Sequence, residues 1–375
     1  MKLGKYIKQP QGYKAFIPDP FPPKRGFDLS SRLIQKASMA TLKLGKLDGI
    51  TQLLPDKDFF LFMYIRKDAT SSSQIEGTQA TMIDAIEAES KTTDQLPDDV
   101  NDILHYIDAL NYGIKRLEKI PLSLRLIKEI HRELMTGGRT TQFADPGYFR
   151  KSQNWISGSS PTNARFVPPP PSAMLDSLSN LEKFLHQKDK LLPVIKAGLI
   201  HAQFETIHPF LDSNGRTGRM LITIYLHMSG LLELPVLFLS WYFKNNQKFY
   251  YESLRKYANG QIDNWLDFFL DGITTTADEA VETVKRITLL RERDMRKIQS
   301  LGKQSATSSI KVLRELFKMP IVNVNTIRQW TGYSTRQGAQ KVIDRFIKLE
   351  ILELKDKNKT YGRSFIYKEY LDIFK

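Results

Sequence analysis

One run of twelve residues, 208–219, constrains this chain more than any other segment. It reads His-Pro-Phe-Leu-Asp-Ser-Asn-Gly-Arg-Thr-Gly-Arg. The residues before it, 191–206, and after it, 220–228, are predominantly apolar. Apolar flanks of this kind predict two core helices joined by a tight turn. The polar side chains of the run are therefore expected to gather in that turn.

The residue types in the turn suit a phosphate site beside a base. The Asn-Gly pair at 214–215 tolerates the backbone angles of a sharp turn, and the N–H groups that open the next helix form an anion site. Arg216 and Arg219 are three positions apart, so they share one face of the first turn and can grip the same anion. Asp212 is a hard oxygen ligand that can hold Mg²⁺ together with phosphates. His208 can accept a proton near neutral pH.

The run resembles the signature of the Fic family, His-Pro-Phe-x-(Asp/Glu)-Gly-Asn-Gly-Arg-x-x-Arg. Taken singly, each residue could be a helix cap or a helix-end pair, but eight matches in order favour the family. The matches are His208, Pro209, Phe210, Asp212, Asn214, Gly215, Arg216 and Arg219. Ser213 departs from the pattern, because the family usually has Gly there, and its side chain restricts the backbone angles of the phosphate loop.

The resemblance implies a role for each of these residues. His208 would be the general base that takes a proton from a Tyr, Ser or Thr of a target protein. Asp212 would hold Mg²⁺ on the α- and β-phosphates of ATP. The turn 213–215 and Arg216 would cradle the phosphates, and Arg219 would hold the γ-phosphate. ATP is then the substrate and Mg²⁺ the cofactor.

Four further residues are expected near this site or in the core. In similar proteins, residues at the positions of Gln203 and Asn245 line the nucleotide site, and the alternative for each is a surface amide. Tyr250 and Tyr251 could pack near the adenine, but aromatic residues mostly belong to cores, so we expect core positions. The other histidines show no metal-ligand spacing.

A second motif, at 72–77, reads Ser-Ser-Gln-Ile-Glu-Gly. It resembles the inhibitory motif (Ser/Thr)-x-x-x-Glu-(Gly/Asn) of the Fic subclass with an N-terminal inhibitory helix. By resemblance, Ser72 orders the segment, and Glu76 pairs bidentately with Arg219 in the place of the γ-phosphate. ATP could still bind, with its α-phosphate misaligned. The alternative is a solvated Glu at a helix end, with Gly77 as the C-cap.

Between the two motifs, residues 145–168 predict a short hairpin. Two β-prone arms flank a tip of Ser, Gly and Asn, and four prolines follow from Pro168. This segment resembles the flap that covers the Fic active site and aligns the target by strand addition. The alternative is a surface hairpin before a Pro-rich linker.

Length and pattern predict three regions. They are a helical region with the inhibitory motif (1–95), a Fic catalytic domain (96–300) and a C-terminal domain (304–375). The first 25 residues contain five prolines and are expected to be an extended lead-in. The polar run 304–309 is expected to be a linker.

The C-terminal region predicts three helices and a two-stranded wing, which is a winged helix-turn-helix. Its recognition helix would begin near Ser334 and present Thr335, Arg336, Gln337, Gln340 and Lys341. Residues 304–375 hold 14 Lys and Arg against 7 Asp and Glu, a balance typical of DNA-binding domains. Winged helices also serve as protein-docking or dimerisation modules, so both readings stay open.

Composition limits the location and the partners. The absence of Cys suits a reducing cytosol, and we expect a cytoplasmic protein. The charged N-terminus does not look like a secretory signal, and no run reaches about 18 apolar residues, so no membrane partner is expected. The net charge of +14 favours acidic partners: nucleotides, nucleic acid or an acidic protein. The family resemblance also implies homodimers.

The sequence therefore predicts a mainly α protein with a Fic-type helical core, a β-hairpin flap and a C-terminal winged helix. The predicted function is an auto-inhibited protein adenylyltransferase that acts on a target protein or on itself and releases diphosphate. One alternative is a DNA-binding transcription regulator whose Fic fold senses nucleotide. Others are Fic enzymes that transfer UMP or phosphocholine, or that remove AMP, with the same His and Asp.

Overall fold

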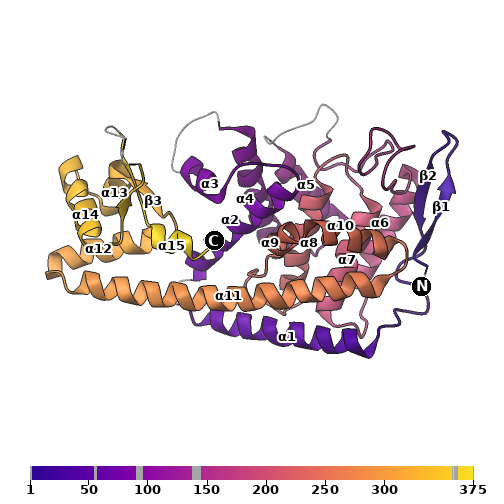
Figure 1. Ribbon diagram of the computed structural model, residues 1–375, viewed down its shortest axis with the longest axis horizontal. Coiled ribbons are helices and arrows are strands. Elements are labelled where there is room, and N and C mark those ends of the chain that lie inside the picture. The colour runs from indigo at the N-terminus through magenta and orange to yellow at the C-terminus, as the bar shows by residue number, and fades with distance from the viewer. Residues whose placement is uncertain are drawn as a thin grey trace.

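The structure is a computed structural model that describes residues 2–54, 57–89, 96–136, 145–356, 358 and 362–374. Its strands are β1 (Gly4–Lys8), β2 (Lys14–Pro18), β3 (Ile321–Asn323), β4 (Glu353–Leu354) and β5 (Ser364–Ile366). Its helices are α1 (Ser31–Gln52), α2 (Lys57–Ile75), α3 (Met82–Glu89), α4 (Asp98–Leu117), α5 (Leu124–Met135), α6 (Pro171–His186), α7 (Pro193–Ile207), α8 (Asn214–Met228), α9 (Ser240–Asn245), α10 (Gln247–Ala258), α11 (Ile262–Gln299), α12 (Lys303–Leu316), α13 (Val324–Thr331), α14 (Arg336–Lys348) and α15 (Lys368–Asp372). The prediction of a mainly helical fold is confirmed (Figure 1).

Helices α7 and α8 carry the signature run and lie in the interior. Nearly all of their residues are buried, as expected for helices that are apolar on every side. Helix α7 ends at His208, which adopts a left-handed conformation with φ of 51°, and Pro209 cannot continue the helix because it lacks an N–H. Helix α8 then begins at Asn214. The helix–turn–helix predicted for this run is therefore present.

The long helices α1 and α11 lie side by side along one edge of the molecule (Figure 1). Lys36 pairs with Asp267 and Asp271, and Lys43 pairs with Asp278, at 2.7 to 2.8 Å. Exposed ion pairs of this kind contribute little, so the buried face of α1 supplies most of the attachment. That face consists of Leu33, Ala37, Ala40, Leu44 and Leu47.

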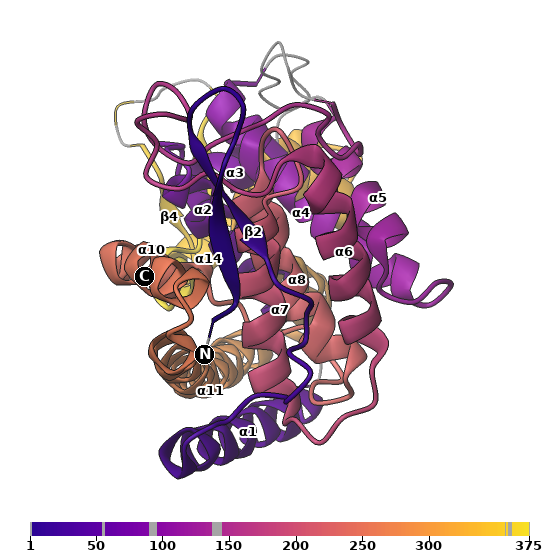
Figure 2. The same ribbon diagram turned by 90° about the vertical axis from the view of Figure 1, so that its right-hand side faces the viewer.

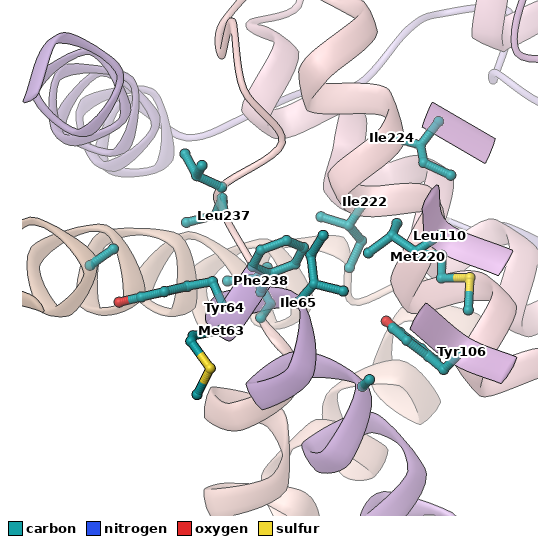
Figure 3. Close-up of a cluster of buried hydrophobic side chains, with 14 of the residues drawn as sticks. Met63, Tyr64, Ile65, Tyr106, Leu110, Met220, Ile222, Ile224, Leu237 and Phe238 are labelled. Atoms are coloured by element: carbon teal, nitrogen blue, oxygen red, sulfur yellow. The ribbon is translucent and has the colours of Figure 1, made fainter. Parts of the chain in front are cut away.

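The hydrophobic core joins the helix of the inhibitory motif to the helix of the signature. Figure 3 shows side chains from α2, α4, α8 and the segment before α9 packed together. The labelled residues are Met63, Tyr64, Ile65, Tyr106, Leu110, Met220, Ile222, Ile224, Leu237 and Phe238. All are buried, so α2 has a fixed position against α8.

The first 25 residues are not the extended lead-in that the prolines predict. Strands β1 and β2 form an antiparallel hairpin (Figure 2), and Gly12 supplies the left-handed turn with φ of 94°. Four of the five prolines lie outside the ladder, and Pro18 is its last residue, so they do not interrupt the pairing. Phe16 anchors the hairpin, because its N–H donates to the Val167 carbonyl at 2.8 Å.

The polar run 304–309 is not a linker, because it lies in the first turns of α12. Its hydroxyl groups find partners within the helix and on α14. Ser309 Oγ donates to the Ser305 carbonyl at 2.8 Å, and Arg345 Nη1 donates to the same carbonyl and to Ser309 Oγ. The polar side chains therefore pack α12 against α14, which a composition-based prediction cannot anticipate.

The C-terminal elements run α12, β3, α13, α14, β4, β5 and α15, and the sheet order is β3-β5-β4. The three helices and the last two strands were predicted, whereas β3 and α15 were not. Residues 357 and 359–361, in the predicted wing, lie outside the described residues. Arg293 of α11 pairs with Glu369 of α15 at 2.6 Å, which ties these elements to the long helix. No helix of the described chain is long and apolar enough to cross a membrane.

The predicted flap is a loop with one antiparallel bridge, between Ile156 and Phe166. Its base is fastened to the end of α7 by the buried Arg150. The guanidinium donates to the carbonyls of His208 at 2.9 Å, Ser152 at 3.1 Å, Pro169 at 2.5 Å and Ile207 at 3.4 Å. A positive group at a helix C-terminus is also favoured by the helix dipole.

Replacing Arg150 with Met should destabilise the fold by about 2–4 kcal/mol, because several buried carbonyls would lose their donor. The urea midpoint of unfolding measures this loss. Arg132→Met is the matched control, since the Arg132 side chain is 53% exposed, and it should leave the midpoint nearly unchanged. Equal midpoints for the two variants would contradict the anchoring role.

Candidate active site

A cavity of about 480 Å³ lies between α7, α8, α10, the end of α2 and the flap. Its volume falls in the range of small-molecule sites. Four residues predicted from the two motifs line it: Glu76, His208, Gly215 and Arg219. The other lining residues are Trp155, Ile156, Ser157, Arg165, Phe166, Glu205, Thr206, Tyr250, Tyr251, Leu254, Arg255 and Ala258.

The turn between α7 and α8 is clamped by the Asn214 side chain. Its Oδ1 accepts from the Phe210 N–H, and its Nδ2 donates to the Phe210 carbonyl, both at 2.8 Å. Ser213 adopts a left-handed conformation with φ of 56°, which costs a non-glycine residue about 1 kcal/mol. Its Oγ accepts a hydrogen bond from Arg216 Nη2 at 2.5 Å, which offsets part of this cost. Asn214 and Ser213 thus shape the turn and do not line the cavity.

Asp212 is held in place by its neighbours in the turn. Its Oδ1 accepts from the Ser213 N–H at 2.5 Å, and its carbonyl lies 3.2 Å from His131 Nε2. His131 Nδ1 accepts from the Gly147 N–H at 3.0 Å, so Nε2 carries the proton and donates to Asp212. Burial lowers the pKa of His131 to about 4 and keeps the ring neutral. His131 is a supporting residue that the sequence analysis took to be ordinary.

The donors around Asp212 fit a magnesium site only in part. Asp212 Oδ2 makes no hydrogen bond to any residue that the structure describes. Among those residues, no three His, Asp or Glu side chains form a group that could hold a metal ion. A cation at Asp212 would therefore need oxygen ligands from a bound phosphate chain, which is how Mg²⁺ is commonly held.

Arg219 is buried and receives its partners from α2. Its Nε donates to Ser72 Oγ at 2.8 Å, and its Nη2 donates to the Ser72 carbonyl at 3.0 Å and to Glu76 Oε1 at 2.7 Å. Burial alone would lower the pKa of Arg219, but the negative charge of Glu76 raises it above its usual value. The predicted Glu76–Arg219 contact is present, although it uses one carboxylate oxygen and is not bidentate.

Glu76 lies directly against the first turn of α8. A Cβ atom on Gly215 would come within 2.3 Å of Glu76 Oε1 and 2.9 Å of Arg219 Nη1. Glycine is therefore needed here for the close approach of the carboxylate. Because helix N-termini bind anions, Glu76 occupies the position where the sequence predicts a phosphate.

Arg216 and Arg219 pair with different carboxylates in this structure. Its Nη1 pairs with Asp102 Oδ1 of α4 at 3.2 Å, and its Nη2 bonds to Ser213. Both Arg216 and Asp102 are buried, and a buried charge requires a partner. Arg216 therefore stabilises the turn through Asp102 and Ser213. It is not among the residues that line the cavity.

His208 lies at the cavity as a neutral imidazole. Burial, with the charge of Arg150, lowers the pKa of His208 to about 4, although the Glu205 carbonyl and the charge of Glu76 oppose this. At neutral pH the ring therefore carries one proton and keeps one lone pair. A neutral imidazole can act as a proton acceptor.

Glu205 is a cavity residue that the sequence analysis missed. Burial raises the pKa of Glu205 to about 8, with Arg219 opposing and Glu76 adding to the shift. Its Oε2 lies 3.9 Å from His208 Nδ1. The signal in the sequence was an acidic residue within an otherwise apolar helix, where an ionised side chain would be costly.

Two predicted nucleotide-site residues are not at the cavity. Gln203 is buried and accepts from the Tyr257 hydroxyl at 3.1 Å, and Asn245 is exposed at the end of α9. Tyr250 is a core residue, as expected, and also lines the cavity. Tyr251 is 39% exposed, so the expectation of a core position was wrong for it.

The end of α2 is fixed from three sides. Buried Asp68 accepts from the Tyr106 hydroxyl at 2.6 Å and from the Ser240 N–H at 3.1 Å. Gln247 Nε2 donates to the carbonyl of Ile75, the last residue of α2, at 3.1 Å. Glu76 is therefore presented to α8 from a fixed support.

Comparison with known families agrees with this geometry. Residues 34–115 match the Fic/DOC family N-terminal model, and residues 121–226 match the Fic/DOC family model. The two ranges together take in half of the chain, and the chain belongs to the Fic/DOC family.

Curated relatives match a part of the chain. The protein adenylyltransferase Fic of Drosophila grimshawi is 30% identical over 187 residues, which cover 48% of this chain and 35% of the relative. The protein of the same name from Drosophila melanogaster is 29% identical over 187 residues, which cover 48% of this chain and 34% of the relative. The chain thus spans about a third of the length of these relatives.

Solved structures share the fold. A Fic family protein from Desulfovibrio desulfuricans G20 has a TM-score of 0.59 at 18% identity, and the match covers 91% of this chain and 97% of the other. Fic-1 (residues 134–508) from C. elegans has a TM-score of 0.51 at 18% identity, covering 68% of this chain and 74% of the other. At these identities the likeness concerns the fold.

The raised pKa of Glu205 predicts a pH-dependent stability. A carboxyl group whose folded pKa, about 8, exceeds its usual value of 4.5 contributes stability that is lost as pH rises through about 8. Glu205→Gln stays neutral, so its Tm should fall less than the wild-type Tm between about pH 6 and about pH 9. The exposed Glu252, paired with Lys256 at 3.1 Å, provides the control Glu252→Gln. Parallel Tm curves for wild type and Glu205→Gln would show that Glu205 is already ionised.

Proposed function

We propose that this protein transfers AMP from ATP to a hydroxyl group of a target protein. One observation carries the proposal: the neutral imidazole of His208 and the buried guanidinium of Arg219 face one cavity at the N-terminus of α8. A proton acceptor beside an anion site is the arrangement that nucleotidyl transfer needs. The name of the curated relatives, protein adenylyltransferase, supports the same activity.

In the proposed reaction, His208 accepts the proton of a target Tyr, Ser or Thr hydroxyl. The hydroxyl oxygen then bonds to the α-phosphorus, the bond from that phosphorus to the bridging oxygen breaks, and diphosphate leaves. Arg219 and the first N–H groups of α8 hold the phosphate charge. Mg²⁺ held by Asp212 and the phosphates would supply further charge neutralisation. Ile156 and Phe166, on the flap, would align the target segment.

Glu76 is the proposed inhibitor of this reaction. It pairs with Arg219 and lies against Gly215, so it takes the donors that the γ-phosphate would use. A carboxylate and a phosphate cannot both occupy this position, because they would repel each other and compete for one guanidinium. Removal of Glu76 therefore frees the site for an aligned nucleotide.

Replacing Glu76 with Gly should raise AMP transfer at least about tenfold, the effect of roughly 1.4 kcal/mol. Adding His208→Ala to this variant should abolish transfer, because no proton acceptor remains. The measurement is incorporation of label from α-³²P-ATP with Mg²⁺ into the protein itself and into lysate proteins. His186→Ala, which alters an exposed histidine, is the control and should retain transfer.

The donor nucleotide is tested in the same assay. Label from UTP and none from ATP would replace AMP transfer with UMP transfer. Loss of label from a pre-modified target would indicate AMP removal. No label in any variant, with ATP binding intact, would contradict the proposed enzyme.

A second candidate function rests on the C-terminal elements, which we propose form a winged helix. Arg336, Gln337 and Lys341 are exposed on the first turns of α14, at the end of the molecule farthest from α7 (Figure 1). The N-terminal residues of a recognition helix are those that read the major groove. DNA binding by this helix would make the protein a nucleotide-sensing regulator.

Reversing the charge of Arg336 and Lys341 (both to Glu) should weaken binding to a DNA duplex of about two helical turns by at least tenfold. Lys5→Glu with Lys8→Glu on the exposed β1 is the matched control, since it changes the net charge equally. Fluorescence anisotropy at several salt concentrations measures the DNA affinity of both double variants. Equal losses in the two double variants would assign any binding to net charge and would exclude α14 as the reader.

A further inference from the structure

Two buried polar atoms at the end of α7 have no hydrogen-bond partner among the residues that the structure describes. Glu205 Oε1 and His208 Nδ1 are both buried, and neither makes a hydrogen bond to the residues that the structure describes. The second carboxyl oxygen, Glu205 Oε2, lies 3.9 Å from His208 Nδ1. Leaving two buried polar atoms without a partner is costly, so the arrangement at this end of α7 calls for an explanation.

The surroundings keep Glu205 in this position. A Cβ on Gly218 would lie 2.3 Å from Glu205 Oε1, so the glycine of α8 makes room for the carboxyl group. Arg219 of α8 and Glu76, beyond α2, both act on the charge of Glu205. From α10, Tyr250 and Tyr251 face the same charge.

The charge of Glu76 acts on His208 as well as on Glu205, and His208 also faces cations. Arg150 approaches from the base of the flap, where its Nε donates to the His208 carbonyl. Arg165 of the flap and Arg255 of α10 also line the cavity. These cations do not accept a proton. The acceptors toward the His208 ring are the Glu205 carbonyl, which raises its pKa, and Glu205 Oε2, which lies 3.9 Å from Nδ1.

We propose that Glu205 is the positioning residue of His208. Its carboxylate accepts a hydrogen bond from Nδ1–H, which leaves the Nε2 lone pair for the target hydroxyl, and it stabilises the imidazolium that forms when Nε2 takes the proton. A base oriented by a third group is a recurring arrangement in catalysis. This inference rests on the proposed AMP transfer and adds a pH dependence to it.

The protonation state of Glu205 decides whether its carboxyl group can accept a hydrogen bond from His208 Nδ1–H. A neutral carboxyl group is itself a hydrogen-bond donor, so its O–H can donate to Nδ1, and the single ring proton then lies on Nε2 and points at the target. An ionised Glu205 only accepts, and the imidazole then has the productive tautomer. The two groups titrate as a pair, and kcat/KM for the target should rise with pH as Glu205 ionises, near pH 8.

The first test is a pH profile in the Glu76→Gly background. Glu205→Gln should lose the rise in kcat/KM and lower kcat at about pH 9 by about ten- to a hundredfold, with KM for ATP little changed. Glu205→Asp retains the ionisable group and should restore part of the rise. The exposed control, Glu252→Gln, should keep the parent profile. Melting curves check that each variant folds.

The second test reads the imidazole directly and needs no turnover. In ¹⁵N-labelled protein at about pH 9, the ring resonances of His208 should show the proton on Nδ1. Glu205→Ala should shift the ring towards Nε2–H, because the acceptor is gone. The same tautomer in wild type and Glu205→Ala would overturn the proposal.

The two tests separate this inference from the proposed function. If Glu205→Gln transfers AMP and its kcat/KM still rises with pH as in the parent, Glu205 has no positioning role and the proposed AMP transfer stands. No transfer in any variant would remove the proposed function, and the His208 tautomer would then decide the positioning role by itself.

Discussion

The buried guanidinium of Arg219 is the constraint on which the rest of the site depends. A permanent charge taken out of water is tolerated only with hydrogen-bond partners and a counter-charge. Segment 72–76 supplies both, through the Ser72 hydroxyl and carbonyl and the Glu76 carboxylate. The end of α2 is therefore required at the N-terminus of α8 whenever no other anion is present. Any ligand that displaces Glu76 must itself bring negative charge to Arg219.

The helix that precedes Glu76 is held firmly, whereas the Glu76 side chain is partly exposed. Asp68 and Ile75 hold α2 through bonds to Tyr106, Ser240 and Gln247. Glu76 comes after the last helical residue, and its side chain is 39% exposed while that of Arg219 is 2% exposed. The core around α2, which Figure 3 shows, therefore fixes the helix, whereas the Glu76 side chain lies outside that core.

The sequence predicts what is encoded locally and misses what distant elements decide. Pro209 and Asn214 specify the turn between α7 and α8 by themselves, so the turn was predicted. The pairing of Arg216 with Asp102 was not predicted, because Asp102 is 114 residues away. No local sequence pattern indicates that pair. The run 304–309 has the composition of a linker, yet Arg345 of α14 bonds to two of its serines. Glu205 was overlooked because α2, α8 and α10 create its environment.

The burial of His208 creates a chemical difficulty that a second group can resolve. Burial keeps the ring neutral at neutral pH, but it does so by lowering the pKa to about 4. A base this weak has little tendency to take a proton from a hydroxyl group. Raising its basicity requires negative charge close to Nδ1 at the moment when the imidazolium forms. Glu205 lies 3.9 Å away and is itself held neutral by burial until pH nears 8. Burial moves the two pKa values in opposite directions, because it disfavours the charged form of each group.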